Sequence, residues 1–193
     1  LLDACTSYGT HLWLPFSQRR EAWNLIAVVD PLFTLLLALP LWFALRRPDA
    51  RVLRWALALG LGYFGLSAFQ QQRAEHEVVA LAKARGHAAS QLSVKPSMAN
   101  LVLWRSLYVY DGRVQADAFH LGLATRHYPG ESAQLLDAEG ARRVAAGDAG
   151  RLRDIERFRV FSDGFLVLDK ARPGFVGDAR YAMQPTAIAP IWG

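Results

Sequence analysis

Apolar residues gather in two runs near the start of the chain, and a mixed, more polar sequence follows them. The first run covers residues 23–45 and the second covers residues 52–69. A helix over the first run would be about 34 Å long at ~1.5 Å per residue, which is enough to cross the hydrocarbon core of a bilayer. The pattern predicts a membrane α-helical hairpin of two transmembrane helices.

Asp30 interrupts the first run and leaves two interpretations open. Either the helix covers the whole run and Asp30 lies inside the membrane zone, or the helix begins at Pro31 and the preceding segment lies at the interface. The part after Asp30 would be only about 22 Å long, so it would cross only where the bilayer thins. An aspartate before a proline is a favourable helix start. Pro40 predicts a kink in this helix.

The second run contains small residues, Ala58 and Gly62 among them, at a spacing that lets membrane helices approach closely. Four arginines lie in or beside the short turn between the runs, namely Arg46, Arg47, Arg51 and Arg54. Positive charge favours the cytoplasmic side of a membrane. We therefore expect residues 1–22 and the C-terminal part to share the opposite face.

The sequence on either side of the apolar runs predicts two further parts. Residues 1–22 are rich in turn-forming residues and carry Trp13 and Phe16, which favours an interfacial loop segment. Residues 70–193 predict a small soluble α+β domain, beginning with a polar helix over 70–87. Strand-like segments with turn signals between them follow at 91–94, 101–110, 113–120, 165–169 and 175–183. A helix over 136–158, broken near Gly147 and Gly150, separates the third and fourth of these.

Composition and charge agree with a membrane protein. The hydrophobic fraction is 52%, the net charge is +5 and the pI is about 9.7. Because many of the arginines flank the apolar runs, the basic excess indicates membrane edges, and no nucleic-acid partner is expected. Cys5 is the one cysteine of the sequence, so an internal disulfide is impossible.

Two acids are candidates for chemistry. Asp3 lies beside a loop of small polar residues, where a carboxylate could bind a metal ion or act as a base, or could simply cap a helix in water. Asp30 is the other, because an acid at the bilayer centre costs roughly 2.5–3.5 kcal/mol on insertion scales and intramembrane acids tend to be functional. The five histidines show no metal-ligand spacing.

Three pieces of the N-terminal sequence resemble the membrane-bound metal-dependent hydrolase family of YdjM type, which is also labelled LexA-binding. They are Leu-Asp-Ala-Cys-Thr-Ser-Tyr-Gly-Thr at 2–10, Trp-Leu-Pro-Phe at 13–16 and Val-Asp-Pro-Leu-Phe-Thr at 29–34. Residues 100–105, 157–165 and 177–181 are similar to longer members of the family. Residues 97–99 depart from the pattern expected before Asn100.

The resemblance implies a multi-pass protein of the bacterial inner membrane and a metal-dependent hydrolase. The family's histidine motif lies upstream of the aspartate loop, so we expect this chain, which opens at Leu1, to be a fragment without that motif. The residues that carry over are Asp3 and Asp30 as catalytic residues, Asp3 also as a metal ligand, and Thr6 and Tyr8 as contacts to the substrate.

Two hypotheses follow. In the first, a divalent metal ion such as zinc is held between upstream histidines and Asp3 at the membrane surface, and it activates water for hydrolysis. Asp30 would orient a ligand, and a lipid or lipid-linked phosphate would fit the location. In the second, the lipid bilayer only anchors the chain, and the C-terminal domain recognises a protein partner. The LexA-binding label favours the second but requires a cytoplasmic domain, whereas the arginine pattern favours the other face.

Overall fold

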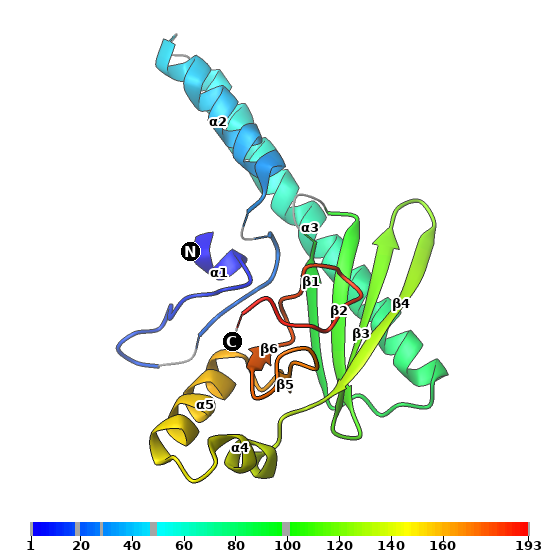
Figure 1. The fold of residues 1–193 in the computed structure, drawn as a ribbon. Helices are drawn as coiled ribbons and strands as arrows, with labels where there is room; N and C mark the ends of the chain where they lie inside the picture. Colours follow the sequence, from blue (N-terminus) through cyan, green and yellow to red (C-terminus); the bar gives the residue numbers. More distant parts are fainter. Residues whose placement is uncertain (1, 18–19, 28, 47–49, 98–100, 193) are drawn as a thin grey trace. The chain divides into compact units, whose positions relative to one another are not determined.

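The computed structural model describes residues 2–17, 20–27, 29–46, 50–97 and 101–192 (Figure 1). The centre of the predicted basic turn, residues 47–49, and the turn at 98–100 lie outside the described residues. The chain divides into two compact units. Unit 1 comprises Leu1–Glu77, Val94–Trp104 and Phe119–Arg126, and unit 2 comprises Val78–Ser93, Arg105–Ala118 and His127–Gly193.

Helix α2 (Pro31–Arg46) begins where the second interpretation of Asp30 places it. The Oδ1 atom of Asp30 accepts the backbone N–H of Phe33 at 3.0 Å, and the Thr34 hydroxyl donates to the Asp30 carbonyl at 2.8 Å. The other interpretation, a helix over the whole of residues 23–45, is wrong, because the described residues between 23 and 30 are not helical. The helix continues through Pro40.

Helix α3 (Ala50–Ala84) has 35 residues and unites the second apolar run with the predicted polar helix. At ~1.5 Å per residue it is about 52 Å long. By length and composition, α3 is long and apolar enough to cross a membrane, whereas α2 is a shorter apolar helix of 16 residues. One helix of membrane-spanning length is therefore present in the described part of the chain.

Helices α2 and α3 run side by side in unit 1 (Figure 1). The ring of Phe33 lies 5.5 Å from that of Tyr63 and 5.0 Å from that of Phe64. A Cβ atom added to Gly60 would lie 3.3 Å from the side chain of Leu37, whereas one added to Gly62 would meet nothing within 4 Å. The close approach is thus at Gly60, and the prediction that named Gly62 is wrong.

The strands form a four-stranded antiparallel sheet in the order β1-β2-β3-β4 (Figure 1). Asp111 and Gly112, with φ angles of 48° and 67°, make the two-residue turn between β2 and β3. The predicted strands at 91–94, 101–110 and 113–120 are confirmed, with bounds β1 (Gln91–Pro96), β2 (Leu103–Tyr110) and β3 (Arg113–Leu121).

Strand β4 (Thr125–Gln134) was not predicted. Its first seven residues are exposed and it contains Pro129, so neither alternation nor β-propensity marks it in the sequence. It is an outer strand of the sheet. Proline is tolerated there because one edge of such a strand donates no ladder hydrogen bond.

Unit 2 also contains α4 (Ala138–Ala145) and α5 (Ala149–Phe161), which pack against each other. Their N-caps are Asp137 and Asp148, which accept backbone N–H groups of the following turn. The predicted break near Gly147 is confirmed, since Ala146 and Gly147 have φ angles of 51° and 86°. Gly150 is the second residue of α5, so the break lies just before it.

A short antiparallel pair completes unit 2. β5 (Leu166–Leu168) pairs with β6 (Val176–Asp178), with Val167 opposite Gly177. The strand predicted over 175–183 therefore has only three residues, all within its first half. The buried core of this unit joins residues of β2, β3, β4 and β5 with the C-terminal segment, among them Leu107, Val114, Ala133, Phe165 and Ile188.

Candidate functional site

The predicted site residues near the N-terminus lie in or just after α1 (Leu2–Cys5). The backbone N–H and the hydroxyl of Thr6 both donate to the main-chain carbonyl of Asp3, at 3.1 and 2.8 Å. The N–H of Tyr8 donates to the Thr6 hydroxyl at 3.3 Å. The structure thus brings Asp3, Thr6 and Tyr8 together through the backbone. The Asp3 carboxylate is exposed and has no hydrogen bond to a described residue.

The loop that contains these residues is held to α3 within unit 1. The carbonyls of Ala4 and Cys5 accept the N–H groups of Trp23 and Leu25, at 2.7 and 2.9 Å. Gln71 then donates to the carbonyl of Trp23 at 2.9 Å, and Ser67 donates to that of Leu25. Polar side chains of one helix therefore fix the backbone of the segment around α1.

Asp30 is 5% exposed, and both of its carboxylate oxygens are engaged by the protein. Oδ1 accepts the N–H of Phe33, and Oδ2 accepts the hydroxyl of Tyr63 at 2.5 Å. Ile26, Phe33, Tyr63 and Leu101 form an apolar cluster around this contact. Asp30 thus starts α2 and joins it to α3. Its predicted catalytic role stays a prediction.

The residues present do not fit a complete metal site. Among the described residues, no three histidine, cysteine, aspartate or glutamate side chains lie close enough together to hold a metal ion. Asp3 could supply one oxygen ligand, and the oxygens of Asp30 already accept hydrogen bonds. A structural or catalytic zinc site needs three or four protein ligands.

A second polar cluster, in unit 2, is centred on Asp117 of β3, whose side chain is 1% exposed. Arg85, which follows α3, binds both of its oxygens, with N–O distances of 2.7 and 2.9 Å. His127 of β4 places its Nε2 atom 2.7 Å from Oδ1. A buried carboxylate is stable when it is paired and hydrogen-bonded in this way.

Tyr108 extends the cluster toward a second histidine. Its hydroxyl lies 2.9 Å from a guanidinium nitrogen of Arg85 and 2.9 Å from Nδ1 of His87. The ring of His87 stacks on that of Tyr110 at 4.0 Å. The hydrogen bond to Asp117 raises the pKa of Arg85, and this effect outweighs desolvation. This arrangement can hold the negative charge of Asp117 and can orient the imidazole rings of His87 and His127.

Two buried arginines fix the C-terminal segment of unit 2. Arg105 donates to the carbonyls of Ala179, Gln184 and Pro185, and burial lowers its pKa to about 10. Burial acts to lower the pKa of Arg180 as well, but hydrogen bonds and charge from Asp178 outweigh it, so that pKa is raised. Both arginines have internal partners, which indicates a structural role.

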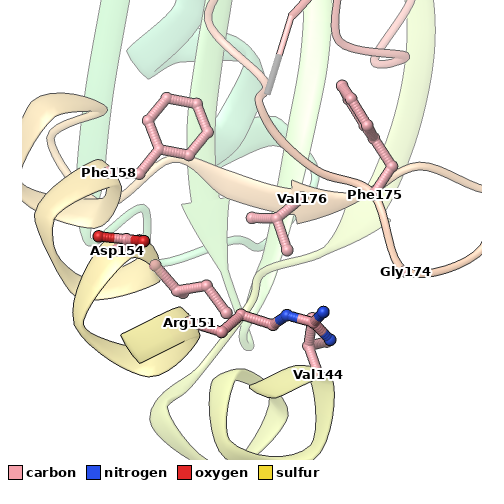
Figure 2. A pocket seen from close by; sticks show the side chains of 8 residues that line it. Val144, Arg151, Asp154, Phe158, Gly174, Phe175 and Val176 are labelled. Carbon is pink, nitrogen blue, oxygen red and sulfur yellow. The ribbon is translucent and has the colours of Figure 1, made fainter. Parts of the chain in front are cut away.

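A pocket of about 370 Å³ lies between α4, α5 and the residues that open β6 (Figure 2). Figure 2 shows Phe158 and Phe175 on either side of Val176, with Arg151 near Val144. The residues that line the pocket come from three short segments of unit 2, namely Val144, Arg151, Asp154, Ile155, Phe158, Gly174, Phe175 and Val176.

The comparison with protein families concerns the N-terminal part. Residues 1–74 match the family model described as YdjM inner membrane protein. The N-terminal segment is of the YdjM type. The predicted resemblance is confirmed over these residues. A search of the curated proteins and a search of the solved structures each found no significant match.

The YdjM-type segment contains Asp3, Thr6, Tyr8, Asp30 and most of α3. Together with the apolar α3, it makes this chain an inner-membrane protein, as predicted. The Asp117 cluster and the pocket lie beyond it. The sequence signal for Asp117 was an acid inside an otherwise apolar strand segment, Ala116–Phe119. A charged residue there has to be paired if the strand is buried.

Proposed function

We propose that this chain is a membrane-anchored binding protein of the inner membrane, in which α2 and α3 are the anchor and unit 2 recognises a protein partner. The observation that carries the anchor is the outward-facing apolar surface of the two helices. Leu45 is 77% exposed and Trp55 is 70% exposed. Leaving one such side chain in water forgoes roughly 1.5–3 kcal/mol relative to burial, so this surface requires lipid.

The proposed anchor is a hairpin that crosses the membrane twice. The part of α3 from Ala50 to Phe69 has about the 20 residues that a bilayer core requires. Helix α2, at ~1.5 Å per residue, is about 24 Å long and would cross with local thinning. The guanidinium of Arg46 lies 4.5 Å from the centre of the Trp42 ring. Such an arginine–tryptophan pair suits the lipid–water interface at a helix end.

Two features of unit 2 favour recognition over catalysis. Asp117 is paired with Arg85 and His127, and Arg180 is paired with Asp178. These charged groups are satisfied within the unit, which indicates a stable scaffold. One concave surface of the unit is the apolar pocket between α4 and α5, on helices that carry six arginines and three acids. Apolar pockets with a few polar groups at the rim are typical of binding sites.

Site-specific photo-crosslinking in living cells tests this proposal. A photoreactive residue replaces Asp154, which lines the pocket on α5, and the matched control carries it at Arg113 on β3, outside these helices. The expected result is one discrete adduct that forms at position 154 and not at position 113. Equal labelling at both positions, or none at either, would contradict a partner-binding role for this face.

A metal-dependent hydrolase is the second candidate function, and the exposed, unengaged carboxylate of Asp3 beside Thr6 and Tyr8 supports it. The test is elemental analysis of the protein purified without chelator, with Asp3→Ala beside the wild type. Stoichiometric metal that is lost in the variant would place Asp3 in a metal site and favour the hydrolase. Metal in neither protein would favour the binding protein.

A further inference from the structure

The walls of the pocket in unit 2 are apolar and preformed. Val144, Phe158 and Val176 pack against a buried cluster that includes Ile155 and Leu166. Their side chains are only partly buried, so one face of each remains available. A pocket of about 370 Å³ lies near the lower end of the range for small-ligand sites. It is suited to one bulky apolar group.

Phe175 is held in place by a neighbouring arginine. The guanidinium of Arg172 lies 3.5 Å from the centre of the Phe175 ring. Arg172 also pairs with Asp169 at 2.5 Å and donates to the carbonyl of Pro190 at 2.9 Å. Because these contacts fix the aromatic wall before any ligand arrives, little conformational entropy is lost on binding.

The two helices that wall this pocket carry more arginines than acids. Arg143, Arg157 and Arg159 form ion pairs with acids three or four residues away on the same helices. Three other arginines on α4 and α5 form no ion pair within 4 Å with a described residue, namely Arg142, Arg151 and Arg153. Arg151 lines the pocket together with one acid, Asp154, which pairs with Arg157, whereas Arg153 lines a separate hollow on α5. The helices that wall the pocket are therefore net basic, which favours an anionic ligand with an apolar part.

We infer that this pocket binds one bulky apolar side chain of an acidic segment in a protein partner. The inference rests on the proposed function and names the chemistry of the partner. Arg151 lines the pocket and the other arginines are spread over both helices around it, which suits several carboxylates along one chain. A single lipid headgroup would engage fewer of them, and a bilayer surface is met by protruding apolar side chains, whereas this feature is concave.

The test uses the whole chain in phosphatidylcholine nanodiscs and two fluorescein-labelled synthetic peptides. The first reads Glu-Asp-Glu-Phe-Glu-Asp-Glu, and the second has alanine in place of phenylalanine. Fluorescence anisotropy should show binding of the first peptide that is about tenfold tighter than binding of the second, since one buried aromatic group supplies at least that discrimination. Equal binding of both peptides, or binding of neither, overturns the inference.

Three variants locate the binding. Arg151→Glu should weaken binding of the first peptide about tenfold, and Val144→Phe should weaken it by filling the pocket. Arg113→Glu, which reverses an exposed charge of β3, should leave the Kd within about twofold. Thermal unfolding checks that each variant is folded, and Arg151→Glu keeps the test valid should Val144→Phe unfold. An equal loss of affinity in Arg151→Glu and Arg113→Glu overturns the inference.

Lipid is the alternative occupant of the pocket, and a competition experiment distinguishes it from an acidic peptide. Short-chain phosphatidylglycerol that displaces the first peptide from the wild type, but no longer binds Arg151→Glu, would assign the pocket to lipid and overturn the peptide inference. The photo-crosslinking experiment is independent of the peptides. An adduct at position 154 without peptide binding would refute this inference and leave the proposed function standing, whereas absence of the adduct would refute the proposed function.

Discussion

Buried carboxylates are the residues that most constrain this molecule. Asp30, Asp117 and Asp178 are each less than 10% exposed, and each accepts hydrogen bonds from within the protein. The sequence predicted the capping role of Asp30, because an aspartate before a proline is a local signal. It could not predict Tyr63, the partner 33 residues away. The signal of Asp117, an acid in an apolar strand segment, does not name its partners Arg85 and His127, which lie 32 and 10 residues away.

Replacement of Asp117 by alanine should destabilise unit 2. The change leaves the guanidinium of Arg85 and the imidazole of His127 without their carboxylate. Removal of one partner from a fully buried pair costs roughly 3–5 kcal/mol, but Arg85 is partly exposed to water, so we expect about 2 kcal/mol. Chemical unfolding in detergent measures this. Asp154→Ala is the control, because its pair with Arg157 is exposed and should change stability by less than about 0.5 kcal/mol.

Asp148 should make the stability of α5 depend on pH in the acidic range. The backbone N–H groups of Arg151 and Gly150 lower the pKa of this N-cap carboxyl. Because the pKa is lower in the folded state, the stabilisation is complete above the ordinary aspartate pKa of about 4 and is lost as the pH falls through the folded-state pKa. The difference in Tm between the wild type and Asp148→Ala should therefore be constant from pH 7 to about pH 5 and shrink below it. A constant difference down to about pH 2 would contradict this.

At the level of elements, the sequence predicted what short-range signals determine. The start of α2, the turn at Asp111–Gly112 and the break near Gly147 all depend on residues within a few positions. Strand β4 was missed because its existence depends on pairing with β3, and its exposed residues carry no pattern. The role of Gly60, in place of Gly62, depends on which face of α3 meets α2.

Gly130 tests the packing of β4. A Cβ atom at this position would lie 2.4 Å from the Ala116 carbonyl oxygen and 2.5 Å from that of Thr186. Both are backbone atoms, so Gly130→Ala requires the strand or the C-terminal segment to move. We expect a loss of about 1–3 kcal/mol in the free energy of unfolding. In Gly62→Ala the added Cβ meets nothing within 4 Å, so that control should not be destabilised. Equal effects would show that the contact is not retained in solution.

For the whole molecule, composition and charge predicted the membrane, and the family match over residues 1–74 agrees. The α+β character of the second part followed from the change of period after residue 90. The pocket and the Asp117 cluster could not be predicted, since each is assembled from separate segments whose packing no local pattern specifies. A partner-binding surface of this kind becomes visible only in three dimensions.

The arginines that flank the connection between α2 and α3 predict the orientation of the whole chain. Arg46, Arg51 and Arg54 favour the cytoplasm, so the proposed two-crossing hairpin should have its C-terminus on the periplasmic side. A C-terminal alkaline phosphatase fusion should be active, and a green fluorescent protein fusion exported through the same route should be dark. The opposite pattern would place unit 2 in the cytoplasm and restore a LexA-type partner as a candidate.

The order of the sheet bears on how the protein is made. Its strands are neighbours in space in the order of synthesis, so each hairpin can close across a short loop as soon as its second strand has emerged from the ribosome. Arg105 is different, because its acceptor carbonyls lie 74 to 80 residues further along the chain. Until those residues have been synthesised, the guanidinium of Arg105 lacks these carbonyl partners and has to stay hydrated. The core around Arg105 can therefore close only after the C-terminal segment has been made.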